Sequence, residues 1–229
     1  MKYALVTRSD DNIKQMTDIT HPLLKEYAKK CNADFIIFDH KPQLNTDDNK
    51  PHYRILKAQE LLKDYDRILF LDSDMIINKN CPNIFDEVPV DCIGSVFEDK
   101  GSRLKDRRDK IKGIQKSWGD IGWTGGYTNA GTFVISKEHS KIFDPHKGKY
   151  WMGWGSADLH LSYMARKHKY KFHELSYKWN HMTMFSERWN KNANRFDSYI
   201  IHYAGKGIYN KKNRIDQIQH DKDIIFKNS

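Results

Sequence analysis

The chain has 229 residues, of which 38% are hydrophobic and 30% are charged. This length and composition suit one α/β domain with its own core, and they exclude a largely disordered protein, because enough apolar surface is present to offset the entropy lost on folding. No apolar stretch approaches the ~20 residues that span a bilayer, and the apolar run at the start is too short for a signal peptide, so we expect a soluble cytoplasmic protein without a membrane anchor.

Short apolar runs alternate with helical periodicity in the first third of the chain. Three strands are expected, at 3–7, 33–38 and 67–71. Helical spacing predicts one helix that contains Leu23 and Tyr27 and must begin, end or kink at Pro22, and a second helix that opens at Pro51. This alternation is typical of a Rossmann-like α/β fold with a mostly parallel central sheet flanked by helices, whose ligands bind beyond the carboxyl ends of the strands.

The basic segment 100–116 carries a net charge of +6, which is most of the net +9 of the chain. We interpret it as a solvated basic helix face, and the alternative is a mobile segment beside a site for an anionic ligand. The segment holds no aromatic residue that could stack on bases. It therefore predicts at most salt-sensitive, sequence-independent nucleic-acid binding, and no nucleic-acid partner is expected.

The rest of the chain mixes strands and helices. Further strands are expected at 90–97, 127–136 and 199–203, and helices at 157–168 and at the C-terminus. Isoleucines on one face of the last helix suit packing against the sheet. The three cysteines, Cys31, Cys81 and Cys92, are odd in number and widely spaced, which favours buried reduced thiols over a metal site or a disulfide framework.

Two carboxylates directly follow the uninterrupted apolar strand at 67–71. Asp72 and Asp74 lie on the same side of an extended backbone, while Ser73 points away. Mg²⁺ and Mn²⁺ prefer such oxygen ligands and keep positions open for substrate phosphates. A turn or a helix cap carries the same pattern, but the preceding apolar run favours a metal site that assists the departure of a diphosphate.

A phosphohydrolase of the haloacid dehalogenase type shares this strand-end pair, with its first aspartate as nucleophile. That family places the pair near the N-terminus and follows it two residues later with Thr or Val. Here the pair begins at Asp72 and is followed by Met75 and Ile76. A phosphohydrolase is therefore the lesser alternative.

Several segments in the same order resemble those of the A-type-fold (GT-A) glycosyltransferases, and most nearly the branch that contains glycogenin and the bacterial lipopolysaccharide galactosyltransferases. They are Tyr53 to Asp74, the Asn-Ala-Gly strand at 127–135, and Ile201 to Gly205, so the resemblance spans most of the first 205 residues. It implies a single-domain GT-A fold over 1–229. The expected parts are a nucleotide-binding half at about 1–100, a donor-sugar and acceptor half at about 120–205, and a C-terminal tail and helix at 206–229.

The resemblance also implies site residues. Asp72, Asp74 and His202 would be the metal ligands, for Mn²⁺ or Mg²⁺, and the imidazole nitrogen favours Mn²⁺. The donor, a UDP-sugar by family habit, would contact Val6, Thr7, Arg54, Ser73, Asn129, Ala130, Gly131, Gly205 and Lys206. The family usually carries a lysine three residues after this glycine, a position that holds Ile208 here.

The segment 151–160 resembles the loop and helix start where these enzymes carry an acidic residue near the reacting carbon. Asp158 is the expected catalytic residue, as a general base in an inverting reaction or as a group that orients and stabilises the donor sugar in a retaining one. The alternative is an acid in a first helical turn, favoured by the helix dipole. Trp151 and Trp154 suit either stacking on sugar faces or the core.

The sequence therefore predicts a metal-dependent glycosyltransferase that uses a nucleotide diphosphate sugar and an unidentified glycan, protein or lipid hydroxyl as acceptor. The alternative from another class is a catalytically silent nucleotide-sugar-binding protein on the same scaffold. The intact set of Asp72, Asp74 and His202 argues against that alternative.

Overall fold

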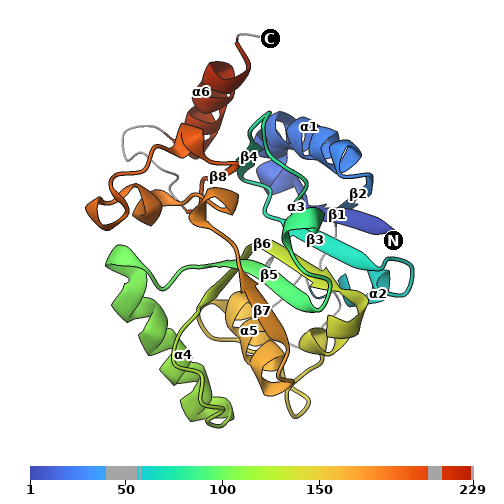
Figure 1. Ribbon diagram of the computed structural model, residues 1–229, viewed down its shortest axis with the longest axis vertical. Coiled ribbons are helices and arrows are strands. Elements are labelled where there is room, and N and C mark those ends of the chain that lie inside the picture. The colour runs from blue at the N-terminus through green and yellow to red at the C-terminus, as the bar shows by residue number, and fades with distance from the viewer. Residues whose placement is uncertain (40–55, 57, 206–212, 228–229) are drawn as a thin grey trace.

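The centre of the computed structural model, which describes residues 1–39, 56, 58–205 and 213–227, is a six-stranded sheet with the order β2-β1-β3-β6-β5-β7 (Figure 1). Its strands are β1 (Tyr3–Arg8), β2 (Ala33–Phe38), β3 (Arg67–Leu71), β5 (Cys92–Phe97), β6 (Thr128–Ser136) and β7 (Lys171–Glu174). In this sheet β6 alone runs against the other strands, because it pairs antiparallel with both β3 and β5 whereas the remaining pairs are parallel. The mostly parallel α/β sheet expected from the sequence is confirmed.

Helices cover both faces of this sheet. Successive side chains of a strand point to opposite sides, so each strand contributes to the core on both faces. Leu5, Leu69 and Val134 belong to the core with α1 (Lys14–Lys30). Their neighbours Val6, Phe70 and Phe133 belong to the core with two further helices. Those helices are α4 (Leu104–Trp118) and α5 (Ser156–Lys167). The strand ends that carry the predicted site thus lie at the edge of a sheet with a packed core on either side.

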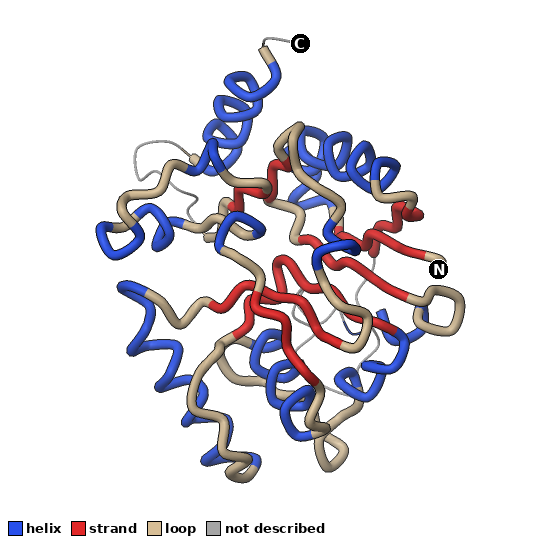
Figure 2. The backbone as a smooth tube through the Cα atoms, viewed as in Figure 1, coloured by secondary structure: helices blue, strands red, loops and turns tan. Residues whose placement is uncertain are grey.

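A second sheet of two strands joins the C-terminal part to the end of β3. Strand β4 (Met75–Ile77) pairs antiparallel with β8 (Ile200–His202), and Met75 lies opposite His202. Helix α6 (Arg214–Phe226) buries Ile218 in a small core with residues of β4, β8 and α1. The expected packing of this helix on the central sheet is wrong, because α6 packs beside the two-stranded sheet, at one end of the molecule (Figure 2).

The structure bears on three helical predictions. Helix α1 neither begins nor ends at Pro22, because apolar residues on both sides of the proline are buried, and this packing outweighs one lost backbone hydrogen bond. The basic segment forms the regular helix α4, as the interpretation of a basic helix face requires. Of the helix expected from Pro51, residues 51–55 lie outside the described residues, and the described part is α2 (Ala58–Leu61).

Short helices that the sequence did not predict complete the fold. They are α3 (Ile84–Glu87) and the 3-10 helices Asp11–Ile13, Gly101–Arg103, Lys137–Phe143, Tyr177–Trp179, Thr183–Ser186, Arg188–Asn190 and Arg195–Asp197. No helix in the described part of the chain is long and apolar enough to cross a membrane.

Candidate active site

The three predicted metal ligands meet at the junction of the two sheets. Asp72 and Asp74 flank the turn between β3 and β4, and His202 ends β8. A hydrogen bond from the Tyr203 backbone N–H to the Asp74 carbonyl oxygen, 2.9 Å long, ties the two segments together. His202 Nε2 lies 3.6 Å from Asp72 Oδ2 and 3.4 Å from Asp74 Oδ1. The structure therefore places these three residues together.

The ligand atoms of these three side chains fit a hard or borderline divalent cation. One ligand atom from each of the three residues lies within 4.8 Å of the others. Neighbouring ligands of an octahedral ion with bonds of about 2.1 Å lie about 3 Å apart, so small movements would bring these atoms to coordination distance. Two carboxylates and one imidazole suit Mn²⁺ or Mg²⁺, and the nitrogen ligand favours Mn²⁺.

Gly131 in β6 leaves room for this cluster. Its carbonyl oxygen accepts a 2.9 Å hydrogen bond from the Asp72 backbone N–H. A Cβ atom at Gly131 would lie 2.8 Å from His202 Cε1 and 2.9 Å from Asp72 Oδ2, closer than non-bonded atoms approach. The glycine therefore leaves room for the side chains of Asp72 and His202 beside the strand.

A basic side chain that the sequence did not indicate lies beside the cluster of Asp72, Asp74 and His202. Arg214, at the start of α6, donates from Nη1 to Asp74 Oδ2 at 2.9 Å. Burial opposes the charged form of Asp74, but His202 and Arg214 outweigh it, and the pKa of Asp74 lies well below its ordinary value. Burial likewise opposes a charged His202, yet the facing Asp74 carboxylate raises the pKa of the imidazole. Only the tertiary fold brings Arg214 here, so its contact carries no local sequence signal.

The cluster opens into a cavity of about 630 Å³. Its charged lining residues are Arg8, Asp72, Asp74, Glu98, Arg103, Arg107, Asp158, His202 and Arg214. Asn129, Ala130 and Gly205 also line it, as does Trp154, which is 52% exposed. The cavity is therefore lined by predicted site residues that follow β3 or lie in β6, α5 and β8, together with four arginines.

Asp158 lies in the first turn of α5 and is bound to β6. Its Oδ1 accepts a 2.9 Å hydrogen bond from the Ala130 backbone N–H, and its Oδ2 accepts a long one, 3.5 Å, from the Tyr127 hydroxyl. Burial, followed by the nearby Glu98 carboxylate, raises the pKa of Asp158 to about 7. A fixed carboxyl that titrates near neutrality is suited to proton transfer.

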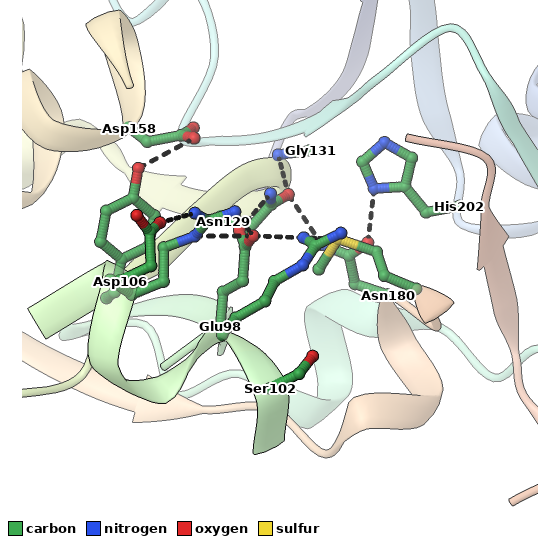
Figure 3. Close-up of polar contacts among 12 residues, drawn as sticks. Glu98, Ser102, Asp106, Asn129, Gly131, Asp158, Asn180 and His202 are labelled. Atoms are coloured by element: carbon green, nitrogen blue, oxygen red, sulfur yellow. Dashed lines mark hydrogen bonds and ion pairs between the residues drawn. The ribbon is translucent and has the colours of Figure 1, made fainter. Parts of the chain in front are cut away.

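The side chain of Asn129 makes three hydrogen bonds inside the protein, which Figure 3 draws. Its Oδ1 accepts from the Gly131 N–H and from Asn180 Nδ2, both at 2.9 Å, and its Nδ2 donates to Glu98 Oε2 at 2.9 Å. Glu98 in turn accepts from Arg107 Nε at 2.9 Å and from Arg103. Sequence reasoning missed Glu98 and Asn180, because neither belongs to a local motif.

The remaining predicted donor contacts differ in their placement. Val6 and Thr7 are fully buried and lie outside the cavity lining, where Arg8 follows them. Ser73 donates from its hydroxyl to the Arg8 carbonyl oxygen and so ties the Asp72–Asp74 turn to β1. Gly205 lines the cavity with a φ of +65°, which favours glycine.

Two predicted donor contacts, Arg54 and Lys206, lie outside the described residues. Contacts from either residue to a donor stay predictions of the sequence.

Comparison with solved structures identifies the class of fold. The structure of a glycosyltransferase involved in glycosylation of the major capsid of PBCV-1 matches with a TM-score of 0.64 and 12% identity, over 96% of this chain and all of that one. The galactosyltransferase LgtC, solved with donor and acceptor sugar analogues, matches with a TM-score of 0.61 and 15% identity, over 97% and 96% of the two chains. The bifunctional glycosyltransferase WbbM matches with a TM-score of 0.67 and 15% identity, over 96% of this chain and 49% of its own.

These likenesses establish a GT-A glycosyltransferase fold across nearly the whole chain, as expected from the sequence. No family model matches the sequence, and a search of curated proteins finds no match either.

Proposed function

We propose that this protein is a metal-dependent glycosyltransferase that transfers a sugar from a nucleotide diphosphate sugar, a UDP-sugar, to a hydroxyl acceptor in glycan synthesis. The observation that carries the proposal is that three side chains suited to bind a metal ion and a carboxyl of near-neutral pKa line one cavity. The GT-A fold of the chain and the glycosyltransferases that share it support the same reaction class.

The charges of the cavity support a diphosphate as ligand. Four arginines and four acidic residues line it, so that their formal charges balance. A divalent cation held by Asp72, Asp74 and His202 would leave an excess of two positive charges, which a diphosphate matches. Arg8 and Arg214, both in the lining, can donate hydrogen bonds to phosphate oxygens.

The metal ligands and Asp158 have different roles in the proposed reaction. When bound, the cation supplies charge neutralisation on the diphosphate as the bond to the sugar breaks. Asp158 is held at Oδ1 by the Ala130 N–H, whereas the Tyr127 hydroxyl makes only a long contact with Oδ2. In an inverting reaction Oδ2 therefore takes the proton of the acceptor hydroxyl. In a retaining reaction the same carboxylate orients the donor sugar and stabilises its developing positive charge.

Trp154 offers an acceptor or donor sugar an apolar surface at the cavity. Its ring is half-exposed, with Arg107 Cζ 4.5 Å and Lys110 Nζ 5.1 Å from the ring centre. These two cations from one face of α4 hold the indole in place, and an indole ring packs well against the C–H face of a sugar. The basic helix α4 thus supports the cavity through the side that carries Arg107 and Lys110.

A panel of nucleotide sugars tests the proposal. We expect one donor to raise the melting temperature in the presence of Mn²⁺ and to undergo Mn²⁺-dependent hydrolysis or transfer. Binding without any turnover across a panel of hydroxyl acceptors would instead identify a silent nucleotide-sugar-binding protein. Release of phosphate from p-nitrophenyl phosphate, with no response to nucleotide sugars, would identify a phosphohydrolase.

A further inference from the structure

The imidazole of His202 is the first member of a row of hydrogen bonds that ends on a buried carboxylate (Figure 3). We infer that Asn180, Asn129 and Glu98 are positioning residues that fix His202 in the tautomer whose bare Nε2 faces Asp72 and Asp74. The inference rests on the proposed metal site and deepens it, because it names the residues that prepare the histidine for a divalent cation.

Three hydrogen bonds make up the row. His202 Nδ1 lies 2.8 Å from Asn180 Oδ1, Asn180 Nδ2 lies 2.9 Å from Asn129 Oδ1, and Asn129 Nδ2 lies 2.9 Å from Glu98 Oε2. His202, Asn180 and Glu98 expose 3% or less of their surfaces. Because these groups are buried, an unmade hydrogen bond among them would cost about 1–3 kcal/mol, so the row is expected to stay intact.

The direction of the row follows from its end at Glu98. An ionised carboxylate only accepts hydrogen bonds, so Asn129 must turn its NH₂ group toward Glu98 and its oxygen toward Asn180. Asn180 must then donate to that oxygen and present its own oxygen to His202. The Nδ1 atom of His202 must therefore carry a hydrogen, and in the neutral ring this leaves Nε2 without one.

Two independent contacts support this direction. The Gly131 backbone N–H, which can only donate, points at Asn129 Oδ1 from 2.9 Å and fixes the orientation of that amide without reference to Glu98. Glu98 itself accepts from Arg103 and Arg107, and although burial opposes its charged form, these arginines lower the pKa of its carboxyl. Both the amide orientation and the ionised end of the row are thus set by the surrounding structure.

The consequence concerns the affinity for metal. A divalent cation binds the lone pair of a neutral imidazole, and the hydrogen bond made by the other ring nitrogen selects the tautomer. Without Asn180, the ring would be free to carry its hydrogen on Nε2, toward the two carboxylates. Partners of this kind typically change metal affinity by about 10- to 100-fold.

The test compares substitutions of Asn180 by two measurements. Asn180→Leu removes the acceptor for Nδ1–H, and we expect Mn²⁺ binding without nucleotide, followed by electron paramagnetic resonance, to weaken at least about 10-fold. Asn180→Asp retains an acceptor for Nδ1–H but loses the donor to Asn129 Oδ1, so it should recover part of that affinity. Asn190→Leu is the matched control, since Asn190 donates to the Phe185 carbonyl oxygen at 2.8 Å in the same part of the chain. It should lower stability and leave Mn²⁺ affinity unchanged.

The second measurement needs no metal. Ring nitrogen shifts of ¹⁵N-histidine are assigned to His202 with a His202→Gln variant and followed upward in pH until the ring is neutral, where they report its tautomer. We expect hydrogen on Nδ1 in the unsubstituted protein and a mixture, or hydrogen on Nε2, in Asn180→Leu. If Asn180→Leu does not fold, Asn180→Ala provides the same test, because it removes the same acceptor for the Nδ1–H of His202.

Hydrogen on Nε2 in the unsubstituted protein, or full Mn²⁺ affinity in folded Asn180→Leu, would overturn the inference. Absence of Mn²⁺ binding in the unsubstituted protein would instead overturn the proposed metal site, whereas the tautomer measurement would still decide the role of the row.

Discussion

Asp74 and Asp158 line the same cavity, and their surroundings drive their carboxyl groups in opposite directions. Around Asp74, His202 and Arg214 outweigh burial, so its pKa falls below the ordinary value. Around Asp158, burial acts together with Glu98, and its pKa rises to about 7. One region holds a permanent anion, and the other holds a carboxyl that exchanges its proton near neutrality.

This difference suggests separate tasks for two acidic residues of the same type. A permanent carboxylate is suited to bind a cation, and a carboxyl with a pKa near neutrality is suited to accept and release a proton. Hydrogen-bonding partners make the separation specific, because Arg214 binds Asp74 and Ala130 binds Asp158. Substitutions at and around Asp74 and Asp158 test whether the two carboxyl groups have these separate tasks.

The largest effect is expected from Asp74→Ala. It removes one ligand of the cation that neutralises the leaving diphosphate, a contribution of several kcal/mol, so metal-dependent donor turnover should fall about 1,000-fold or more. Circular dichroism should show that the variant stays folded. Asp91→Ala is the control, because Asp91 pairs with Lys171 on the surface, outside the cavity lining. Undiminished turnover in Asp74→Ala would refute the metal assignment.

Asp158→Asn should have the next largest effect. The amide keeps the shape of the side chain and an acceptor for the Ala130 N–H but cannot take up a proton, so transfer should fall about 100- to 10,000-fold. Donor binding, measured by calorimetry with Mn²⁺, should be retained. If donor binding is lost instead, Asp158 is part of the scaffold and not of the chemistry.

Arg214→Met should change Mn²⁺ affinity less and in the opposite direction. Without nucleotide, the arginine competes with a cation for Asp74, so its removal should tighten Mn²⁺ binding roughly fivefold, or about 1 kcal/mol. Lys222→Met, in the same helix, is a control that leaves Asp74 untouched. Weaker Mn²⁺ binding in Arg214→Met would show that the arginine organises the site and does not compete for it.

The smallest effect concerns stability and pH in the metal-free protein. A raised pKa means that folded Asp158 binds its proton more tightly than the unfolded chain does. The resulting stabilisation is complete below about pH 4 and is lost as the pH rises through about 7. Asp158→Asn stays neutral and does not lose this stabilisation. Its melting temperature relative to the unsubstituted protein should therefore rise by a few degrees from about pH 5 to about pH 8. A constant difference across this range would contradict the raised pKa.

The sequence predicts much of the site because its strongest signals are local. The apolar run before Asp72 identifies β3, and the spacing of Asp72 and Asp74 identifies two carboxylates on one side of the chain. His202 and Asn129 could be placed only through resemblance to the GT-A enzymes, since their partners lie far away in the sequence. The antiparallel pairing of Met75 with His202 supplies the contact that periodicity alone does not show.

What the sequence did not predict depends on tertiary contacts. Arg214 reaches Asp74 only because α6 packs beside β4, and Glu98 meets Asn129 only where β5 ends next to β6. Asn129 itself was expected to contact the donor sugar, and the structure adds that its amide already makes three internal hydrogen bonds. Its position was predictable from a motif, whereas its partners were not.

The central claim is that Asp72, Asp74 and His202 bind a cation that in turn holds the diphosphate of the donor. Calorimetric titration of UDP into the protein, with Mn²⁺ and then with EDTA, tests it most directly. The account predicts saturable binding with Mn²⁺ and a loss of at least about tenfold in affinity with EDTA. Equal affinity under both conditions would contradict a metal-diphosphate site.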